Sequence, residues 1–339
     1  MNPNLKTKYM GIELRNPIII GASNLSANID NLKRLEESGA AAIVYKSLFE
    51  EQIQLESIKL QEELEAYNDR HAEMIRLFPE IIHAGPDEYL YHLKEARKAL
   101  HIPLFASLNG MYLQTWIEYA QLIQETGVDG IELNFYQVPD SFETKGDSII
   151  EKQIKIIVAL KTKLKIPISV KLDPFYTNPL NVISRMNAAG VKGFVLFNRL
   201  FEPDINVEKE EHIAPLHLSN EGDYRMSLRY AGILYNNINA DICTNTGIYK
   251  SEDVVKMILS GADCVQVVSA VYKHKNNVIS TLLSGLESWM KSKGYKTIDE
   301  FRGKLSKVSV KDPYIYKRAQ YIDMIMNGSE EIIRKYPMR

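Results

Sequence analysis

Short apolar runs alternate with longer amphipathic segments along most of this chain. The first apolar run, residues 18–23, is closed by small residues, which is typical of a strand buried on both faces. In the next segment, residues 29–38, Leu32 and Leu35 share one face and Gly39 provides a stop, as expected of a helix. The chain therefore opens with a strand followed by a helix.

The same alternation continues to residue 293 and predicts eight strands, each followed by a helix. The predicted strands are residues 18–23, 42–46, 103–107, 130–134, 168–171, 193–197, 241–244 and 263–268. The predicted helices are residues 29–38, 86–99, 113–126, 148–164, 180–189, 225–235, 251–259 and 276–293. Consecutive right-handed β-α units imply one closed parallel sheet, so the predicted α/β fold is a (β/α)8 TIM barrel. The alternative, a doubly wound open sheet, is disfavoured because no GxGxxG sequence follows the first strand.

Three segments lie outside this repeat. They are an N-terminal extended segment (residues 1–16), a polar insertion after the sixth strand that ends at residue 221, and a C-terminal helical appendage (residues 297–339). A chain of 339 residues is long enough for two average domains, but a single barrel commonly reaches this length. We therefore expect one TIM-barrel domain over residues 1–339, with the appendage packed outside the barrel or on a partner.

Composition and charge narrow the classes of function. Hydrophobic residues make up 45% of the chain and the formal net charge is −2, so a nucleic-acid partner is not expected. No apolar run approaches the roughly 18 residues of a membrane-spanning helix, and the N-terminus lacks the apolar core of a secretory signal. We expect a cytoplasmic protein with no membrane partner. Cys243 and Cys264 fall within predicted strands and are expected to be buried free thiols.

Two further features are interpreted without functional chemistry. The seven histidines show no HxxxH or HExxH spacing, so no metal site is predicted. The acidic residues 50–65 are expected to form the solvated face of a helix.

Polar side chains stand at the ends of several predicted strands. They are Lys46, Asn109, Asn134, Lys171 and Asn198. In a TIM barrel the carboxyl ends of the strands meet at one face, where active sites lie. A lysine there can hold a phosphate, form a Schiff base or stabilise negative charge on an electron-accepting ring, although an isolated one usually just extends to water. Convergent amides suit a flat heterocycle with both donors and acceptors.

The seventh and eighth units offer candidates for an anion site, because backbone amides and a helix N-terminus gather there in TIM barrels. Gly247 permits close approach of the backbone, and the hydroxyls of Thr246 and Ser269 can donate to phosphate oxygens. The competing interpretation is an ordinary turn after a strand.

Taken in order and at their spacing, these motifs resemble the class 1 dihydroorotate dehydrogenase family, and most closely its bacterial dihydroorotate dehydrogenase-like members, through about residue 291. The matching segments are Arg15-Asn16-Pro17, Gly21-Ala22-Ser23, Tyr45-Lys46-Ser47, Ser107-Leu108-Asn109-Gly110, Glu132-Leu133-Asn134, Val170-Lys171-Leu172, Phe197-Asn198-Arg199, Leu218-Ser219, Gly261-Ala262-Asp263 and Ser269-Ala270.

The resemblance implies FMN as cofactor and residues to bind it. Those around the isoalloxazine ring and ribityl chain would be Ala22, Ser23, Lys46, Asn109, Asn134 and Lys171. Those at the phosphate end would be Ser219, Thr246, Gly247, Ser269 and Ala270. Lys46, Asn134 and Asn198 would also line the substrate face. The implied reaction, in pyrimidine metabolism, is hydride transfer from a small cyclic CH–CH substrate, dihydroorotate or a related compound, to flavin N5. An electron acceptor that the sequence does not specify would reoxidise the flavin, and a homodimer is a family-level expectation.

The segment after the fourth strand departs from the family pattern. Family members carry a catalytic cysteine or serine shortly after the asparagine, whereas this chain has Asn134-Phe135-Tyr136-Gln137-Val138-Pro139. Tyr136 is the candidate acid or base; the alternative is a tyrosine that shapes the pocket, because a phenol with a pKa near 10 is a poor base. The phosphate turn is reduced to Asn245-Thr246-Gly247, and Tyr67-Asn68-Asp69 provides no clear counterpart of the family's substrate loop.

Three hypotheses follow. The preferred one is an FMN-dependent oxidoreductase of the dihydroorotate dehydrogenase type, with Lys46 and Tyr136 as catalytic residues, acting on dihydroorotate or on a different substrate. The second is a non-redox ligand-binding barrel that has lost the base. The third is a lyase or aldolase that forms a Schiff base on Lys171.

Overall fold

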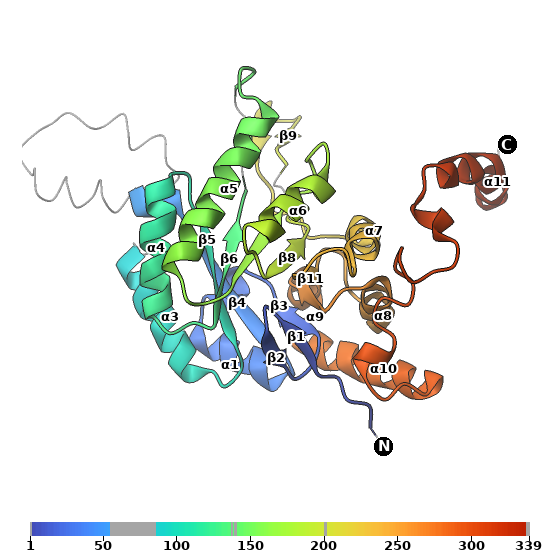
Figure 1. The fold of residues 1–339 in the computed structure, drawn as a ribbon, viewed down its shortest axis with the longest axis horizontal. Coiled ribbons are helices and arrows are strands. Elements are labelled where there is room, and N and C mark those ends of the chain that lie inside the picture. The colour runs from blue at the N-terminus through green and yellow to red at the C-terminus, as the bar shows by residue number, and fades with distance from the viewer. Residues whose placement is uncertain (1, 55–85, 137, 139–140, 200–201, 337–339) are drawn as a thin grey trace, which may run out of the picture.

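Eight parallel strands close into a barrel surrounded by helices (Figure 1). The structure is a computed structural model that describes residues 2–54, 86–136, 138, 141–199 and 202–336. The barrel strands are β3 (Ile18–Ile20), β4 (Ala42–Phe49), β5 (Leu104–Asn109), β6 (Gly130–Asn134), β7 (Ile168–Leu172), β8 (Gly193–Leu196), β11 (Asp241–Thr244) and β12 (Cys264–Val267). Each strand pairs in parallel with the next, and β12 pairs with β3 to close the ring. The predicted TIM barrel is therefore confirmed.

Helices cover the outside of the barrel. They are α1 (Ile29–Glu37), α3 (Pro86–Ala99), α4 (Leu113–Glu125), α5 (Gly146–Lys163), α6 (Pro179–Ala188), α7 (Arg225–Leu234), α8 (Ser251–Ser260), α9 (Ser269–His274) and α10 (Asn277–Lys293). Most bounds agree with the predicted helices. After the eighth strand, however, the short helix α9 precedes α10, because Lys275 adopts a left-handed backbone conformation (φ 61°) that interrupts the helical path.

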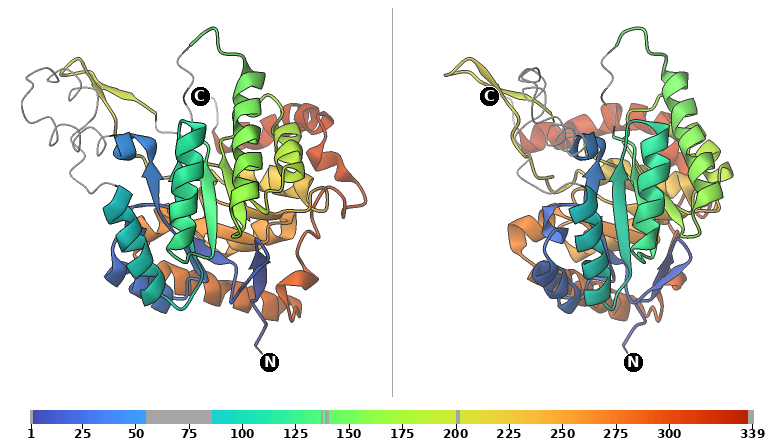
Figure 2. Two further views of the ribbon diagram at one scale, coloured as in Figure 1. Left: turned by 60° about the vertical axis from the view of Figure 1, so that its left-hand side comes forward. Right: turned by 90° about the vertical axis from the view of Figure 1, so that its left-hand side faces the viewer.

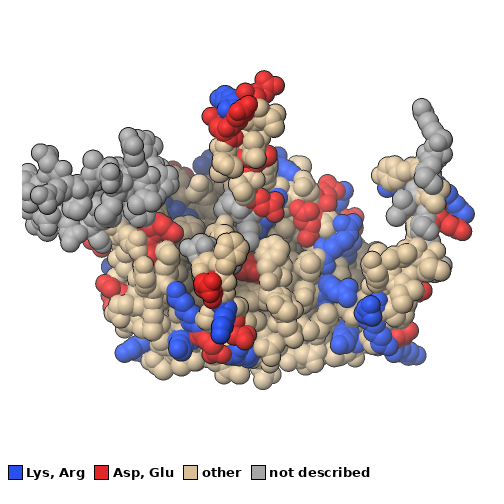
Figure 3. Space-filling model, turned by 90° about the horizontal axis from the view of Figure 1, so that it is seen from above, with Lys and Arg blue, Asp and Glu red and all other residues tan. Residues whose placement is uncertain are grey.

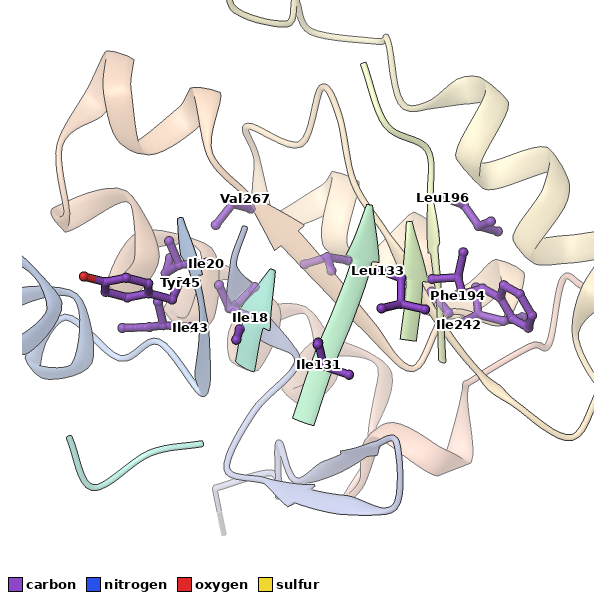
Figure 4. Packing of buried hydrophobic residues seen from close by; sticks show 14 of the residues in the cluster. Ile18, Ile20, Ile43, Tyr45, Ile131, Leu133, Phe194, Leu196, Ile242 and Val267 are labelled. Carbon is purple, nitrogen blue, oxygen red and sulfur yellow. The ribbon is translucent and has the colours of Figure 1, made fainter. Parts of the chain in front are cut away.

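The strands carry two separate apolar layers. Side chains on their outer faces, such as Ile131 and Leu133 of β6, pack against the helices (Figure 4). Side chains on their inner faces form a second cluster with the N-terminal hairpin of β1 (Thr7–Tyr9) and β2 (Ile12–Leu14). Tyr9 of this hairpin meets the ring of Phe105 edge-on at 6.0 Å, and an added Cβ at Gly193 would lie 2.8 Å from the Tyr9 ring. The hairpin thus fills the amino-terminal end of the barrel.

The other segments outside the repeat lie at separate places on the molecule (Figures 1 and 2). The polar insertion after β8 contains a hairpin of β9 (Asp204–Asn206) and β10 (Glu211–Ile213) on the face where the strands end. The C-terminal segment contains η3 (Ile298–Glu300), η4 (Pro313–Tyr316) and α11 (Ala319–Lys335). The Asp312 side chain caps η4 by accepting from Tyr314 N, and α11 stands away from the barrel wall.

The C-terminal segment is tied to the barrel by Arg302. Its guanidinium lies 3.4 Å from the Asp263 carboxylate, and it donates to the Thr7 hydroxyl and to Asp299. Asp263 also accepts a hydrogen bond from Ile242 N at 2.7 Å. Burial raises the pKa of Asp263 to about 7, although Arg302 and the Ile242 amide act in the opposite direction.

This raised pKa predicts a pH-dependent stability. Between the unfolded pKa of about 4 and the folded pKa of about 7, the folded state binds more protons at Asp263. The contribution is therefore fully present below pH 4 and is lost as pH rises toward 7. Relative to Asp263→Asn, which keeps an acceptor for Ile242 N, we expect the wild-type free energy of unfolding to fall by about 2–3 kcal/mol between pH 5 and pH 8. Urea titrations at both pH values test this, and a constant difference between the two proteins would contradict it.

The structure bears on two expectations drawn from the composition, which concern the cysteines and membrane-spanning helices. Cys243 and Cys264 are free and buried on adjacent strands, as predicted. Among the helices of the described ranges, none combines the length and the hydropathy needed to cross a bilayer.

Candidate functional site

A cavity of about 520 Å³ opens where the barrel strands end. Its wall combines strand ends, the loops that follow them and the returning arm of the insertion, residues 215–219. A volume of this size is ordinary for a site that holds an organic ligand. Figure 3 looks onto this face, where basic and acidic side chains are interspersed. The charge inside the cavity is therefore set by the groups that line it rather than by a single-sign surface.

Most of the site residues predicted from the sequence lie in the wall of this one cavity. They are Ala22, Ser23, Lys46, Asn134, Tyr136, Lys171, Asn198, Ser219, Thr246, Gly247, Ser269 and Ala270. Asn109 is not among the described lining residues. Its buried side chain lies behind the wall and donates to the backbone carbonyl of Asn134 at 2.7 Å. Asn109 thus supports the backbone of Asn134.

Two neighbouring asparagines form a hydrogen-bonded pair at the cavity. Asn198 Nδ2 donates to Asn134 Oδ1 at 2.8 Å, and Asn198 Oδ1 accepts from Arg199 N at 3.0 Å. Both carbonyl oxygens therefore already have a partner. The NH2 of Asn134 and the second N–H of Asn198 are the donors that this pair can offer to a ligand.

Lys46 does not stand at the end of its strand as predicted. β4 continues to Phe49, and its register with β5 shifts between Val44 and Ser47. Lys46 lies within this irregularity and lines the cavity, and Ser47, which also lines it, is bonded to Ser107 at 2.7 Å. Local bulges of this kind redirect side chains near active sites.

The second lysine belongs to a buried polar group that crosses the barrel. Lys171 of β7 is 8% exposed, and its Nζ lies 4.0 Å from Glu132 Oε1. Glu132 is 1% exposed and accepts from Gln266 Nε2 of β12 at 2.6 Å. Burial raises the pKa of Glu132, whereas Lys171 and the Gln266 hydrogen bond lower it. Glu132 therefore faces the barrel interior.

Ser219 joins three elements at the other end of the cavity. Its backbone N–H donates to Ser269 Oγ at 3.1 Å, and its own Oγ accepts from Gly247 N at 3.2 Å. Its carbonyl accepts from the Tyr249 hydroxyl and from Lys273 Nζ. Both serine hydroxyls act as acceptors in these bonds, and no acceptor for their own protons occurs in the described part of the chain, so each can donate to an anion.

The Thr246 hydroxyl has acceptors within the protein. It donates to the carbonyl of Phe197 at 3.2 Å, and Asn245 Oδ1 lies 3.5 Å from the same hydroxyl oxygen. The adjacent Gly247 has φ 73°, and an added Cβ would lie 2.8 Å from Asn220 O and Asp223 N. The turn therefore requires glycine at this position.

The segment after β6 places Tyr136 at the cavity. Phe135 is buried and packs edge-on against Trp116 with 5.3 Å between ring centroids, and Trp116 fits closely over Gly110. Because Phe135 is held against α4, the half-buried Tyr136 lines the cavity. Gln137 and Pro139 of the same segment lie outside the described residues.

The acidic stretch after β4 differs from expectation at its first residue. Glu50 is 2% exposed, and it accepts from Met111 N at 2.8 Å and from Thr115 Oγ1 at 2.8 Å. It is a buried cap for the start of α4, not a solvated side chain. Residues 55–65, the segment Tyr67-Asn68-Asp69, and His71 and His83 lie outside the described residues. Within the described ranges no cluster of three potential metal ligands occurs.

The structure adds residues to which the sequence analysis gave no role in the site. The principal ones in the cavity wall are Gln266, Asn245, Arg199, Glu202, His217 and Tyr272. Gln266 is a polar residue inside an otherwise apolar strand, which was a usable signal because such a residue faces the barrel interior. The insertion residues carried no such periodic signal, since their place depends on how the loop folds back.

The cavity at the carboxyl end of this parallel barrel presents two lysines, paired amides and serine hydroxyls. Such a cavity is typical of a TIM-barrel enzyme, and its donors suit an anionic ligand rich in heteroatoms. Residues 81–290 match the family model for dihydroorotate dehydrogenase. The chain belongs to the dihydroorotate dehydrogenase family, whose members are oxidoreductases.

Individual relatives extend over most of the chain. It is 26% identical over 311 residues to the dihydroorotate dehydrogenase B (NAD(+)) catalytic subunit of Methanocaldococcus jannaschii, covering 88% of this chain and 97% of that protein. It is 27% identical over 332 residues to dihydroorotate dehydrogenase A (fumarate) of Lactococcus lactis, covering 89% and 99%. It is 28% identical over 255 residues to dihydroorotate dehydrogenase (fumarate) of Lachancea kluyveri, covering 66% and 75%.

Proposed function

We propose that this protein is a cytoplasmic FMN-dependent oxidoreductase that removes hydride from dihydroorotate or a closely related cyclic CH–CH substrate. The observation that carries the proposal is the presence of two sets of donors in the wall of one cavity. One set comprises Lys46, Lys171 and the asparagine pair, and the other comprises the hydroxyls of Ser219 and Ser269, which act as acceptors in their bonds to described residues. A ligand with a polar ring and a phosphate fits this arrangement of donors.

The donor set fits FMN at both ends. Ser219 and Ser269 would donate to the phosphate, while the Gly247 turn keeps the backbone close. Ala22, Ser23 and Ala270 add small residues to the wall, which leave room for a broad ring. When bound, FMN supplies the hydride acceptor. Lys171 would stabilise the negative charge that the ring gains, since its ammonium is nearly buried and opposed by a single carboxylate in the described part of the chain.

The substrate would bind against Lys46, Asn134 and Asn198. The ammonium of Lys46 attracts a carboxylate, and the N–H groups of the asparagine pair that have no acceptor among the described residues can donate to ring carbonyls. Orientation by several fixed donors reduces the entropic cost of bringing the reacting carbon to the hydride acceptor.

When one carbon of a CH–CH unit loses hydride, the neighbouring carbon must lose a proton for the double bond to form. We assign removal of this proton to Tyr136. Tyr136 lines the cavity two positions after Asn134, where the family pattern has its base. We expect Tyr136→Phe to slow anaerobic flavin reduction by dihydroorotate about 100-fold and to leave FMN binding unchanged. Stopped-flow absorbance measures the rate and fluorescence quenching measures binding. An unchanged rate would assign Tyr136 to shaping the cavity.

The proposal is tested by an absorption spectrum and one anaerobic addition. Purified protein, incubated with FMN and desalted, should retain the visible flavin bands, and dihydroorotate should bleach them. Protein that stays colourless would contradict the flavoenzyme. If the protein binds flavin but dihydroorotate does not bleach it, dihydroorotate is excluded as substrate, while the assignment as a flavoenzyme stands. Reoxidation by fumarate or by NAD+ would then identify the electron acceptor, and light scattering would test the homodimer.

One observation favours a second function. The segment after Asn134 has no cysteine or serine before Pro139, as would be expected of a barrel that binds its ligand without redox chemistry. Such a protein would bind orotate without flavin, so calorimetry on the colourless protein distinguishes the two. A Schiff-base enzyme would instead be trapped on Lys171 by borohydride.

A further inference from the structure

The floor of the cavity, formed by Glu132, Lys171 and Gln266 inside the barrel, contains a hydrogen-bond acceptor without a partner among the described residues. Gln266 is 2% exposed and lines the cavity, yet within the described residues its Oε1 accepts no hydrogen bond. A buried amide oxygen left unpaired costs free energy, so it is normally satisfied by water or by a ligand. The position of this oxygen is therefore evidence about the ligand.

The orientation of this amide is fixed by Glu132. Glu132 lies on β6 and Gln266 on β12, directly across the barrel in the strand order, and they are bonded at 2.6 Å. A carboxylate only accepts, so Gln266 must turn its NH2 toward Glu132 and its carbonyl oxygen away from it. Glu132 itself is not among the described residues of the cavity wall, whereas Gln266 is.

A glycine packs closely against this buried oxygen. A Cβ added at Gly21 would lie 3.0 Å from Gln266 Oε1 and 2.9 Å from Val268 Cγ2. Gly21 directly precedes Ala22 and Ser23, which line the cavity. Lys171, held 4.0 Å from Glu132, presents its ammonium to the same cavity. The Glu132 carboxylate therefore holds one fixed acceptor and one cation in the barrel floor.

We propose that Glu132 is a positioning residue that turns Gln266 Oε1 toward the ligand as an acceptor, so that the floor recognises a ring edge with an imide N–H beside an electron-rich acceptor atom. Gln266 takes the N–H, and Lys171 takes the neighbouring acceptor. This inference rests on the proposed function and adds the chemistry of the ring edge. Both the flavin ring and a pyrimidine substrate carry such an edge.

Binding of FMN and of its N3-methyl analogue to the apoprotein tests the inference, because the methyl group replaces the imide hydrogen. We expect wild type to favour FMN by about 10- to 100-fold, the value of a hydrogen bond to a buried acceptor. Glu132→Gln keeps the shape of the floor but lets residue 132 donate to Gln266 Oε1, which frees the amide to turn. In that variant the preference for FMN over its N3-methyl analogue should fall to about threefold or less. The Gln266→Leu variant should show the same loss of preference.

Gln153→Leu is the matched control. Gln153 is another buried glutamine. It lies on α5, accepts a hydrogen bond from the Tyr176 hydroxyl, and is not among the described lining residues. This variant should retain the wild-type preference, which shows that loss of a buried amide elsewhere does not produce the effect. Because Glu132→Gln does not enlarge the cavity, a steric effect of the methyl group alone would leave its preference unchanged.

A second comparison, orotate against N3-methylorotate on the FMN-loaded protein, identifies which ring is recognised. A preference that depends on Glu132 and Gln266 with FMN assigns the edge to the cofactor, and one seen only with orotate assigns it to the substrate. If FMN binds but neither pair is discriminated, or if Glu132→Gln retains full discrimination, the inference is wrong while the proposed function stands. Failure to bind any flavin would overturn both.

Discussion

Replacement of Lys171 by methionine is expected to slow anaerobic reduction of the bound flavin by dihydroorotate about 100- to 1,000-fold, the range for loss of one preorganised charge-stabilising group. Lys171 is 8% exposed, and it provides the cation of the barrel floor. A cation in a water-excluded site stabilises developing negative charge far more than one in water, because the local dielectric constant is low. Methionine has a similar volume but provides no charge.

Two measurements test this expectation. Stopped-flow absorbance follows the bleaching of the flavin, and a redox titration should show a lower midpoint potential, because the reduced anionic ring has lost its counter-charge. Lys256→Met is a suitable control, since Lys256 is 44% exposed at its side chain and bonds to Tyr224 and Asp253 outside the cavity. A Lys171→Met protein that reduces its flavin at the wild-type rate would remove Lys171 from the reaction.

The second large effect is expected at Ser219. Ser219→Ala should weaken FMN binding about 10- to 100-fold, the value of a hydrogen bond to a charged group, and leave riboflavin binding nearly unchanged. The reason is that the Ser219 hydroxyl accepts from Gly247 N and keeps its proton for an anion. Fluorescence quenching with each flavin gives the ratio of the two affinities. The ratio cancels any general loss of stability.

Thr246→Val distinguishes the structure from the sequence-based expectation. The sequence predicts Thr246 as a phosphate donor, whereas the structure shows its hydroxyl bonded to Phe197 O. Thr246→Val should therefore lower the free energy of unfolding by about 1 kcal/mol without changing the FMN-to-riboflavin ratio. A ratio that falls in Thr246→Val but not in Ser219→Ala would reverse the assignment of the phosphate end.

The barrel and the general place of the site were predictable from the sequence because they depend on local periodicity. Fully apolar runs such as residues 18–20 indicate strands buried on both faces, and eight strand-helix units leave few topologies open. Polar residues such as Asn134 and Lys171 at the carboxyl ends of these runs then necessarily approach one face of the barrel.

The hydrogen-bond partners were not predictable in this way. Glu50 belongs to an acidic run that reads as a solvated surface, yet it caps α4 because the β4 and β5 ends lie side by side. Asn109 and Asn134 read as equivalent strand-end amides, but Asn109 supports the backbone of Asn134. Residues of the same type thus have different roles, because their contacts in the folded structure differ.

The sequence by itself determined that this protein is a parallel barrel with lysines and amides at the carboxyl ends of its strands. It could do so because the apolar periodicity of strands and helices depends on residues that are close together in the sequence. Only the tertiary structure decided which of those groups retain a free donor or acceptor. Glu132 and Gln266 are 134 positions apart and meet only because the sheet closes on itself. Their bond fixes the Gln266 oxygen, and closure of the barrel therefore determines how the floor meets a ligand.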